Sequence, residues 1–488
     1  MQFFNKILRP SHRFKYRVCV LPQRYIMALL LSCGVLALFT IRVSFQVVLF
    51  HMVVPPKIIR FANATITCKY SEPPTPPITT AKKYDWSESH QVHILQAFFL
   101  GYFLGHFPGG YLSDRYGGKI VLSCCTFATI ILTILTPVIL SSSSMDYYTL
   151  IGVQALTGFS TGMLFPSVHS ILAHWTPACD RGKLSGIVFC AAQFGVVLND
   201  AVSFSFILHT EAWSSVFYLY SSIAAIWLVV WLIFGQATYR HGILSTQEEN
   251  AYLDRNLADL VSDNYRKVPW KKMFFSIPLW ALIVSHFGHM WIWHVLILDV
   301  PEYLMYVLRY NMRNSYFLAA LPYSMLAVLT ISNGFFMDYL INNKLVKITT
   351  SRKVFTTFGA VGPAIFLAAV PFVHCSREAA IILFAVGISM TSFYYTGTRI
   401  NTLDLAPNYS GTIMGIVNGI GAIPGVIVPH IEDDLIINNT FNEWKALFWL
   451  HFFILLCTCI FFISFGSGEV QPWNDYELEN RLAHIDAS

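Results

Sequence analysis

The chain has 488 residues and a formal net charge of +5; 55% of its residues are hydrophobic and only 12% are charged. An ordinary soluble domain carries roughly 25% charged residues, so this composition argues against a soluble enzyme, a secreted disulfide-rich module and a nucleic-acid-binding protein. The apolar residues gather in blocks of about 20, the length at which a helix crosses a hydrocarbon core of roughly 30 Å. This pattern predicts a polytopic membrane protein.

Twelve such blocks follow one another along the chain. Each should be helical, because lipid offers the backbone no hydrogen-bond partner and each block is far longer than a barrel strand. We therefore expect an all-α membrane protein whose twelve transmembrane helices form two pseudo-symmetric six-helix halves. The expected spans are residues 26–50, 91–112, 120–140, 148–173, 183–206, 213–235, 273–298, 315–339, 353–374, 379–400, 410–431 and 446–466.

The positive charges predict the orientation of these spans. Residues 1–25 carry six basic side chains and no acidic one, which is typical of a cytoplasmic segment. An even number of spans then places both termini in the cytoplasm. Sequons at Asn63 and Asn438 fall on the outer side, where they can be glycosylated, whereas the sequon at Asn408 falls inside and should stay unused.

The chain divides into five segments on this scheme. A polar stretch rich in charged residues separates spans six and seven and predicts a cytoplasmic linker. The segments are an N-terminal tail (1–25), a first half (26–236) with a glycosylatable outer loop (54–90), the linker (237–272), a second half (273–466) and a C-terminal tail (467–488).

One motif lies between spans two and three, from Gly110 to Lys119 (GYLSDRYGGK). Gly110 allows two helices to approach closely, and Gly117 begins a tight turn. Asp114 can meet the N-terminus of a neighbouring helix, while Arg115 and Lys119 stay in the cytoplasm. A diverged copy after span eight contains Asp338, which indicates an internal repeat.

This motif resembles the signature loop of the major facilitator superfamily. Further runs are similar to solute carrier family seventeen, the group of sialin, the vesicular glutamate transporters and the sodium–phosphate cotransporters. The resemblance implies the major facilitator fold and transport of small anions. The runs that carry it are FFLGY at 98–102, FPSVH at 165–169, LDLAPNY at 403–409, MGIVNG at 414–419 and GEVQPW at 468–473.

Arg42 is the one basic residue that we expect deep inside a span. A charge at that depth costs roughly 3 kcal/mol or more, so it should face a wet cavity or a partner. The resemblance implies that this arginine contacts an anionic substrate, and a guanidinium can grip a carboxylate or phosphate with two hydrogen bonds. The alternative is a structural ion pair within the first half.

Histidines and a tyrosine complete the predicted site. His286 and His289 lie on one face of span seven, and either could bind an anion or carry a proton near neutral pH. The resemblance implies a similar role for His169, and Tyr394 lies on a helix that lines the cavity of this fold. The alternative for each histidine is a neutral ring bonded to a backbone carbonyl.

The sequence departs from the family in span four. Gln154 and Thr161 stand where the family usually has an arginine and a glutamate, and that glutamate is tied to proton coupling in sialin-like members. Asp200 in span five is a candidate substitute carboxylate, and the alternative, which its place in the outer third of the helix favours, is a solvated residue near the outer mouth. We predict coupling through His286 and Asp200, with Na⁺ or H⁺ as the coupling ion.

The ten cysteines show no metal-binding spacing, so we expect no metal and no cofactor. Cys68 and Cys375 both fall on the outer side, and whether they pair is left open. No nucleotide-binding loop is present and nothing indicates an enzyme.

Two functions remain. The first is secondary active transport of organic anions or inorganic phosphate by a monomer in contact with lipid, in the plasma membrane or in a lysosomal or vesicular membrane. The second is an uncoupled channel-like pathway or a non-transporting sensor of the same fold.

Overall fold

The computed structural model describes residues 22–53, 68, 84–141, 147–241, 245–258, 260–262, 266–310 and 312–475. Regular structure in these residues is helical, apart from one isolated β-bridge between Val53 and Tyr84. The predicted all-α fold is therefore confirmed. Asn63 and most of the tails and of the first outer loop lie outside the described residues.

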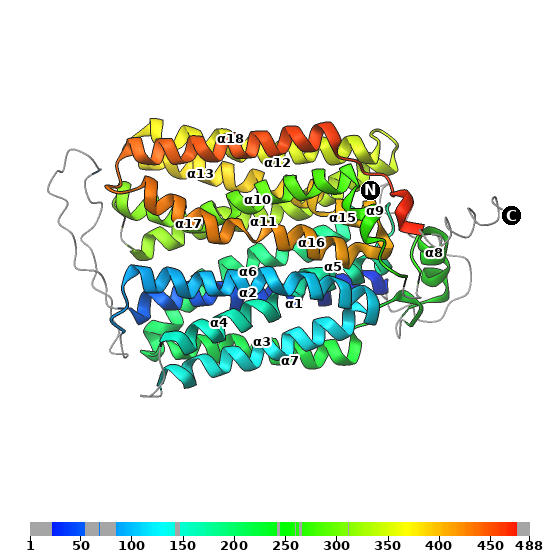
Figure 1. Ribbon diagram of the computed structural model, residues 1–488, viewed down its shortest axis with the longest axis horizontal. Helices are drawn as coiled ribbons and strands as arrows, with labels where there is room; N and C mark the ends of the chain where they lie inside the picture. Colours follow the sequence, from blue (N-terminus) through cyan, green and yellow to red (C-terminus); the bar gives the residue numbers. More distant parts are fainter. Residues whose placement is uncertain are drawn as a thin grey trace, which may run out of the picture.

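The first half consists of long helices that run side by side (Figure 1). They are α1 (Gln23–Met52), α2 (Glu88–Tyr116), α3 (Gly118–Ser141), α4 (Tyr147–Gly162), α5 (Leu164–Trp175), α6 (Arg181–Thr210) and α7 (Ser214–Phe234). The linker follows with η1 (Tyr239–His241), α8 (Gln247–Leu257) and α9 (Trp270–Phe274).

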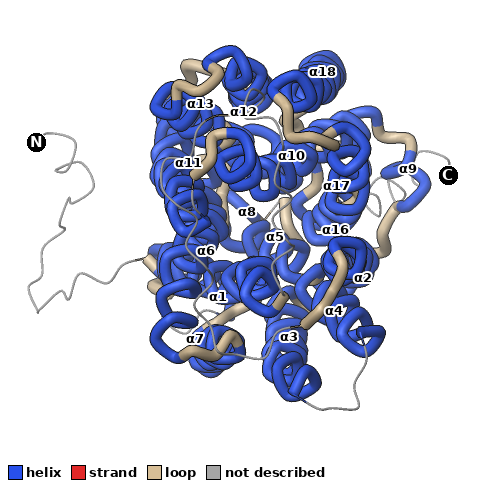
Figure 2. Tube along the Cα trace, turned by 90° about the vertical axis from the view of Figure 1, so that its left-hand side faces the viewer, coloured by secondary structure: helices blue, strands red, loops and turns tan. Residues whose placement is uncertain are grey.

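The second half lies beside the first, as the end-on view also shows (Figure 2). Its long helices are α10 (Ile277–Glu302), α11 (Met312–Asn342), α12 (Ile348–Ala369), α13 (Arg377–Met390), α16 (Ser410–Gly421), α17 (Pro424–Leu435) and α18 (Phe441–Phe465). Shorter pieces are η2 (Tyr303–Val307), η3 (Val370–Val373), α14 (Ser392–Tyr394), η4 (Tyr395–Arg399), α15 (Asn401–Leu405), η5 (Pro407–Tyr409) and η6 (Pro472–Asp475).

Ten helical segments among the described residues are long and apolar enough to cross a membrane. The two remaining crossings are α2, which carries many polar side chains, and the pair α4–α5. The helix of the fourth span is interrupted at Met163, between α4 and α5, because Pro166 has no N–H to donate to the carbonyl of Gly162. Pro424 similarly begins α17 after a break from α16.

The helix of the tenth span is irregular near the centre of the molecule. Residues Tyr395–Arg399 form a π-helical turn between α14 and α15. Such a turn shifts the register of the side chains that follow it, and π turns are often found at functional sites. Here the turn continues the span to Leu405, five residues beyond its predicted end at residue 400.

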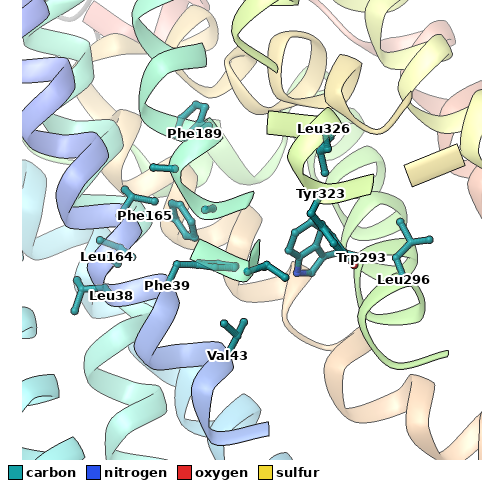
Figure 3. Close-up of a cluster of buried hydrophobic side chains, with 14 of the residues drawn as sticks. Leu38, Phe39, Val43, Leu164, Phe165, Phe189, Trp293, Leu296, Tyr323 and Leu326 are labelled. Atoms are coloured by element: carbon teal, nitrogen blue, oxygen red, sulfur yellow. The ribbon is translucent and has the colours of Figure 1, made fainter. Parts of the chain in front are cut away.

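The two halves meet through aromatic side chains (Figure 3). Phe39 of α1 lies edge-on to Phe165 of the first half and to Trp293 of the second, with ring centroids 6.4 and 6.2 Å apart. Tyr323 of α11 also packs edge-on against the indole of Trp293, with ring centroids 5.8 Å apart. The interface between the two halves is therefore partly apolar.

One end of the bundle carries the α2–α3 loop and α8, at the right in Figure 1, and is called the motif end here. A disulfide between Cys68 and Cys375 lies at the opposite end and answers the question that the sequence left open. Because Cys68 precedes α2 and Cys375 precedes α13, this bond joins the two halves. Asn438 is exposed at the same opposite end, as a glycosylation site requires.

Candidate functional site

Two adjoining cavities lie between the halves, and together they are called the central cavity. Phe39, Arg42 and Trp293 line both of them. The first also contacts Gln46 and Gln154, whereas the second extends to residues of η4 and α16. The described lining residues include no aspartate or glutamate.

Arg42 projects from α1 into this cavity. Its Nη1 donates a hydrogen bond of 2.9 Å to the hydroxyl of Tyr102, and its guanidinium lies 4.3 Å from the centroid of the same ring. Phe39 supports the guanidinium from another side at 5.2 Å. None of the ion pairs among the described residues involves Arg42, so the alternative of a structural ion pair receives no support from the geometry.

Arg399 is a second cavity-lining arginine, contributed by the second half. Its side chain is 4% exposed and lies 4.1 Å from the ring centroid of Phe165. The Nε and Nη2 atoms have no hydrogen-bond partner among the described residues. A buried guanidinium that has no carboxylate partner and two unbonded N–H groups is costly, so this geometry favours an anionic ligand between Arg42 and Arg399.

The predicted tenth span ends at residue 400, which would leave Arg399 at the membrane surface rather than in the cavity. The π turn and the continuation to α15 move it inward by more than one helical turn. Because its position one residue before the predicted end is typical of a surface arginine, the sequence did not identify it as a site residue. Tyr395 of the same turn also lines the cavity. Tyr394, which is predicted from the sequence as a substrate-binding residue, is not among the described lining residues.

His289 lines the cavity, as expected for a substrate-binding residue. Its ring stacks on that of Tyr394 with centroids 3.3 Å apart, and its Nδ1 has no hydrogen-bond partner in the described residues. His169 lies one layer further out, stacked on Phe189 at 5.1 Å, and its Nδ1 bonds the carbonyl of Phe165 at 2.8 Å. His169 therefore matches the neutral structural histidine that was the alternative.

His286 belongs to a buried hydrogen-bond network that crosses between the halves. Its Nε2 donates to Oδ1 of Asn418 at 2.8 Å, and its Nδ1 is bonded to the hydroxyl of Tyr394. Asn418 in turn donates from Nδ2 to Nε2 of His106 at 2.5 Å and to Tyr102 at 3.3 Å. Asn418 and His106 had not been predicted as site residues.

Asp200 is placed away from this network. Its Oδ1 accepts a hydrogen bond of 3.1 Å from Asn199, and it is absent from the described lining of the central cavity. Gln154 and Thr161, the two residues of span four that depart from the family, have different surroundings. Gln154 lines the first cavity, whereas the hydroxyl of Thr161 bonds carbonyls of its own helix.

Two aspartates close the motif end. The carboxylate of Asp114 accepts hydrogen bonds from the backbone N–H groups of Gly411 and Thr412, at 3.1 and 2.6 Å. These groups begin α16, so the carboxylate of the first half meets the positive end of a helix of the second half. The contact with a helix N-terminus that the motif indicated is present.

Asp338 makes the corresponding contact in the opposite direction. Its oxygens accept from the N–H groups of Gly182 and Lys183 at the start of α6, both at 2.8 Å. Glycines make both contacts possible, since a Cβ at Gly110 would lie 2.4 Å from the carbonyl oxygen of Gly411. The two aspartates therefore form a pseudo-symmetric pair of contacts between the halves.

The rest of the motif turns the chain and contacts the neighbouring helices. Gly117 has φ +92°, a conformation that favours glycine. Lys119 donates to the carbonyl of Leu232 near the end of α7 at 3.1 Å, and Arg115 donates to the hydroxyl of Tyr111 at 3.0 Å. Both cations remain at the motif end.

A buried ion cluster adds a third contact there. Asp404 accepts from Nη1 of Arg181 at 2.7 Å and from Nε of Arg352 at 2.6 Å, and all three side chains are at most 4% exposed. Arg181 belongs to the first half and the other two to the second. Asp404 stands in the family-like run at 403–409, but its pairing with two arginines, one of them in the other half, could not be deduced from the sequence.

Comparisons with known proteins place this arrangement in context. A model of the Major Facilitator Superfamily matches residues 58–429. Sialin from Ovis aries is 34% identical over 452 residues, covering 92% of this chain and 90% of sialin. Vesicular glutamate transporter 2 from Homo sapiens is 29% identical over 461 residues, covering 94% of this chain and 76% of that protein.

Solved structures agree on the fold. The proton:xylose symporter bound to 6-bromo-6-deoxy-D-glucose superimposes with a TM-score of 0.65 at 16% identity, covering 92% of this chain and 97% of the symporter. The fucose:proton symporter from E. coli gives 0.56 at 14% identity, with 90% and 98% covered. At these identities the likeness shows the fold alone.

Proposed function

Since the chain belongs to the Major Facilitator Superfamily and is related to sialin and the vesicular glutamate transporters, we propose that it carries a small organic anion or inorganic phosphate across a membrane by alternating access. One observation carries the choice of an anion. Arg42 and Arg399, one from each half, face one cavity whose described lining contains no carboxylate. Guanidinium pairs suit carboxylate and phosphate because each can form two parallel hydrogen bonds.

The structure represents one state of such a cycle. Asp114, Asp338 and Asp404 hold the halves together at the motif end. The first cavity instead extends toward the opposite end, where Gln46, Leu95 and Ile297 line it. Because the basic N-terminal tail marks the motif end as cytoplasmic, this state is closed to the cytoplasm and directed outward.

The disulfide supports the same orientation. Bonds between cysteines persist in oxidising compartments and are rare in the cytosol. Cys68 and Cys375 therefore favour an extracellular or luminal position for the end opposite the motif. We propose a monomeric transporter in the plasma membrane or in a lysosomal or vesicular membrane.

Uptake of labelled anions into proteoliposomes tests the function. The panel contains phosphate, glutamate, sialate and urate, with the sodium and pH gradients varied separately. Saturable uptake of at least one anion is expected in the wild type. Flux that ignores both gradients would indicate the uncoupled pathway instead, and no flux of any anion would contradict transport.

Arg42→Lys examines the guanidinium itself. Lysine keeps the charge but loses the planar pair of donors, so one charge-assisted hydrogen bond is lost. That loss corresponds to ~1.5–3 kcal/mol, or roughly ten- to a hundredfold weaker apparent affinity. Expression should remain normal, because the guanidinium contacts aromatic rings and a hydroxyl rather than a buried carboxylate. Unchanged affinity in this variant would leave Arg42 outside the substrate site.

Asp114→Ala examines the closed end. The change removes both hydrogen bonds to the start of α16, each worth ~1.5–3 kcal/mol for a charged acceptor. The maximal rate should therefore fall while the apparent affinity stays close to that of the wild type, because Asp114 does not line the central cavity. Kinetics of uptake measured over a range of anion concentrations separate the two parameters, and a normal maximal rate would remove the motif from the mechanism.

A further inference from the structure

The buried hydrogen-bond network between the two halves contains side chains that can bind a proton. Its side chains are Tyr102 and His106 of α2, His286 of α10, Tyr394 of α14 and Asn418 of α16, and all of them are at most 2% exposed. The network touches the substrate site directly, because Tyr102 accepts from Arg42 and Asn418 lines the central cavity. Arg42 therefore lies two hydrogen bonds away from Asn418, through the hydroxyl of Tyr102.

The partners of Asn418 determine the proton positions on both histidines. Its Oδ1 can only accept, so Nε2 of His286 must carry a proton. In the neutral ring Nδ1 is then an acceptor, and the hydroxyl of Tyr394 donates to it. The Nδ2 of Asn418 can only donate, so Nε2 of His106 is unprotonated.

His106 is held in this form from both sides. Its Nδ1 lies 2.5 Å from the carbonyl oxygen of Tyr102, an obligatory acceptor, and therefore carries the proton. A second proton on Nε2 would face the N–H groups of Asn418. Accepting it would require the amide to turn over, and the proton of His286 would then have to move from Nε2 to Nδ1 to avoid a contact between two donors. His106 thus orients Asn418 and is a poor proton acceptor.

His286 is in the opposite situation. A proton added at Nδ1 meets the oxygen of Tyr394, whose hydroxyl needs only to rotate from donor to acceptor. The bond from Nε2 to Asn418 is retained, and no heavy atom has to move. We propose that His286 is the proton-binding residue of this transporter, held by Asn418 and Tyr394, and that its proton is taken up together with the anion.

Charge explains why anion and proton should bind together. The positive groups that face His286 and His106 are Arg399 from η4 and Arg42 from α1. The titratable rings of His169 on α5 and His289 on α10 lie in the same region. With two guanidiniums present, a third positive charge is opposed by Coulomb repulsion, and a bound anion removes much of that opposition.

The proposal rests on the function proposed above and selects its coupling ion. Favourable coupling between two ligands is reciprocal, so protons must also strengthen anion binding, typically by 5- to 150-fold. The chain needs such a group because the position that resembles the family's coupling glutamate is Thr161, a residue without a titratable proton. A histidine network of this kind couples transport to H⁺ rather than to Na⁺.

The test uses the full-length protein in proteoliposomes with a pH-sensitive dye inside and the panel anion that the wild type carries fastest. The wild type should acidify the interior during uptake, and its apparent affinity should be roughly tenfold higher at pH 6 than at pH 8. His286→Gln should lose both the acidification and the pH dependence, yet should still exchange internal for external anion. Exchange needs no net proton movement and reports that the variant is folded.

Two more variants sharpen the result. Tyr394→Phe removes the oxygen that accepts from the protonated ring, so the rise in affinity should require a more acidic pH. His451→Gln is the matched control, because His451 is a buried histidine of α18 that bonds Trp291 and does not line the cavity; it should acidify like the wild type. Acidification by His286→Gln at the wild-type proton-to-anion ratio would overturn the proposal and leave anion transport intact. Absence of uptake by the wild type would instead contradict the proposed function.

Discussion

Replacing Arg399 with glutamine is expected to lower the apparent affinity for the transported anion by roughly a hundredfold or more, since two charge-assisted hydrogen bonds of ~1.5–3 kcal/mol each would be lost. The protein should still fold. No described carboxylate pairs with Arg399, so the change leaves no buried negative charge without a partner. The neutral amide instead relieves the cost of burying a guanidinium that has no carboxylate partner.

Uptake kinetics of Arg399→Gln measure this effect, with Arg240→Gln as the matched control. Arg240 lies at the motif end, and its ion pair with Asp254 is exposed, with a distance of 3.8 Å. Loss of such a pair has little effect on stability, so the control should transport normally. Wild-type affinity in Arg399→Gln, with Arg42→Lys impaired, would show that the anion contacts Arg42 but not Arg399.

Asp404→Asn should have the largest effect on the balance between conformations. The change leaves the charges of Arg181 and Arg352 buried without a carboxylate, a loss of roughly 3–5 kcal/mol in the state closed at the motif end. Opening that end separates Arg181 from the second half and exposes it to water. The variant should therefore shift by about two to three and a half orders of magnitude toward the state open at the motif end.

Labelling of an engineered cysteine can follow this shift. Gln46→Cys places a thiol in the part of the central cavity that extends away from the motif end. A membrane-impermeant maleimide added outside should react with it much more slowly when Asp404→Asn is also present. Adding Arg181→Met removes one stranded charge and should restore part of the rate; equal rates in all three backgrounds would show that the ion cluster does not control access.

Sequence reasoning located the parts of the site that depend on position along a helix. Arg42 sixteen residues into its span and Asp114 in a glycine-rich loop could be assigned roles because a lipid environment and a helix terminus each restrict what such residues can do. The twelve spans and their order followed from hydropathy in the same way. These inferences needed no knowledge of which helices are neighbours.

The remaining features depend on breaks in helices and on contacts between halves. Arg399 reaches the cavity because a π turn extends span ten, and nothing in local composition announces such a turn. Asn418 and His106 meet across 312 positions, and Arg181 meets Asp404 across 223. Pairings at this distance are set by the packing of the two halves, which a single sequence does not reveal.

The disulfide has a consequence for how the two halves stay together. The linker between α7 and α10 joins them at the motif end, and Cys68–Cys375 joins them at the other, so the polypeptide forms a covalent ring through both halves. Cutting the linker with a protease would open this ring without releasing either fragment. Both fragments would migrate as one species in a denaturing gel until a reducing agent was added, and even a nicked transporter would keep its halves tethered at the end opposite the motif.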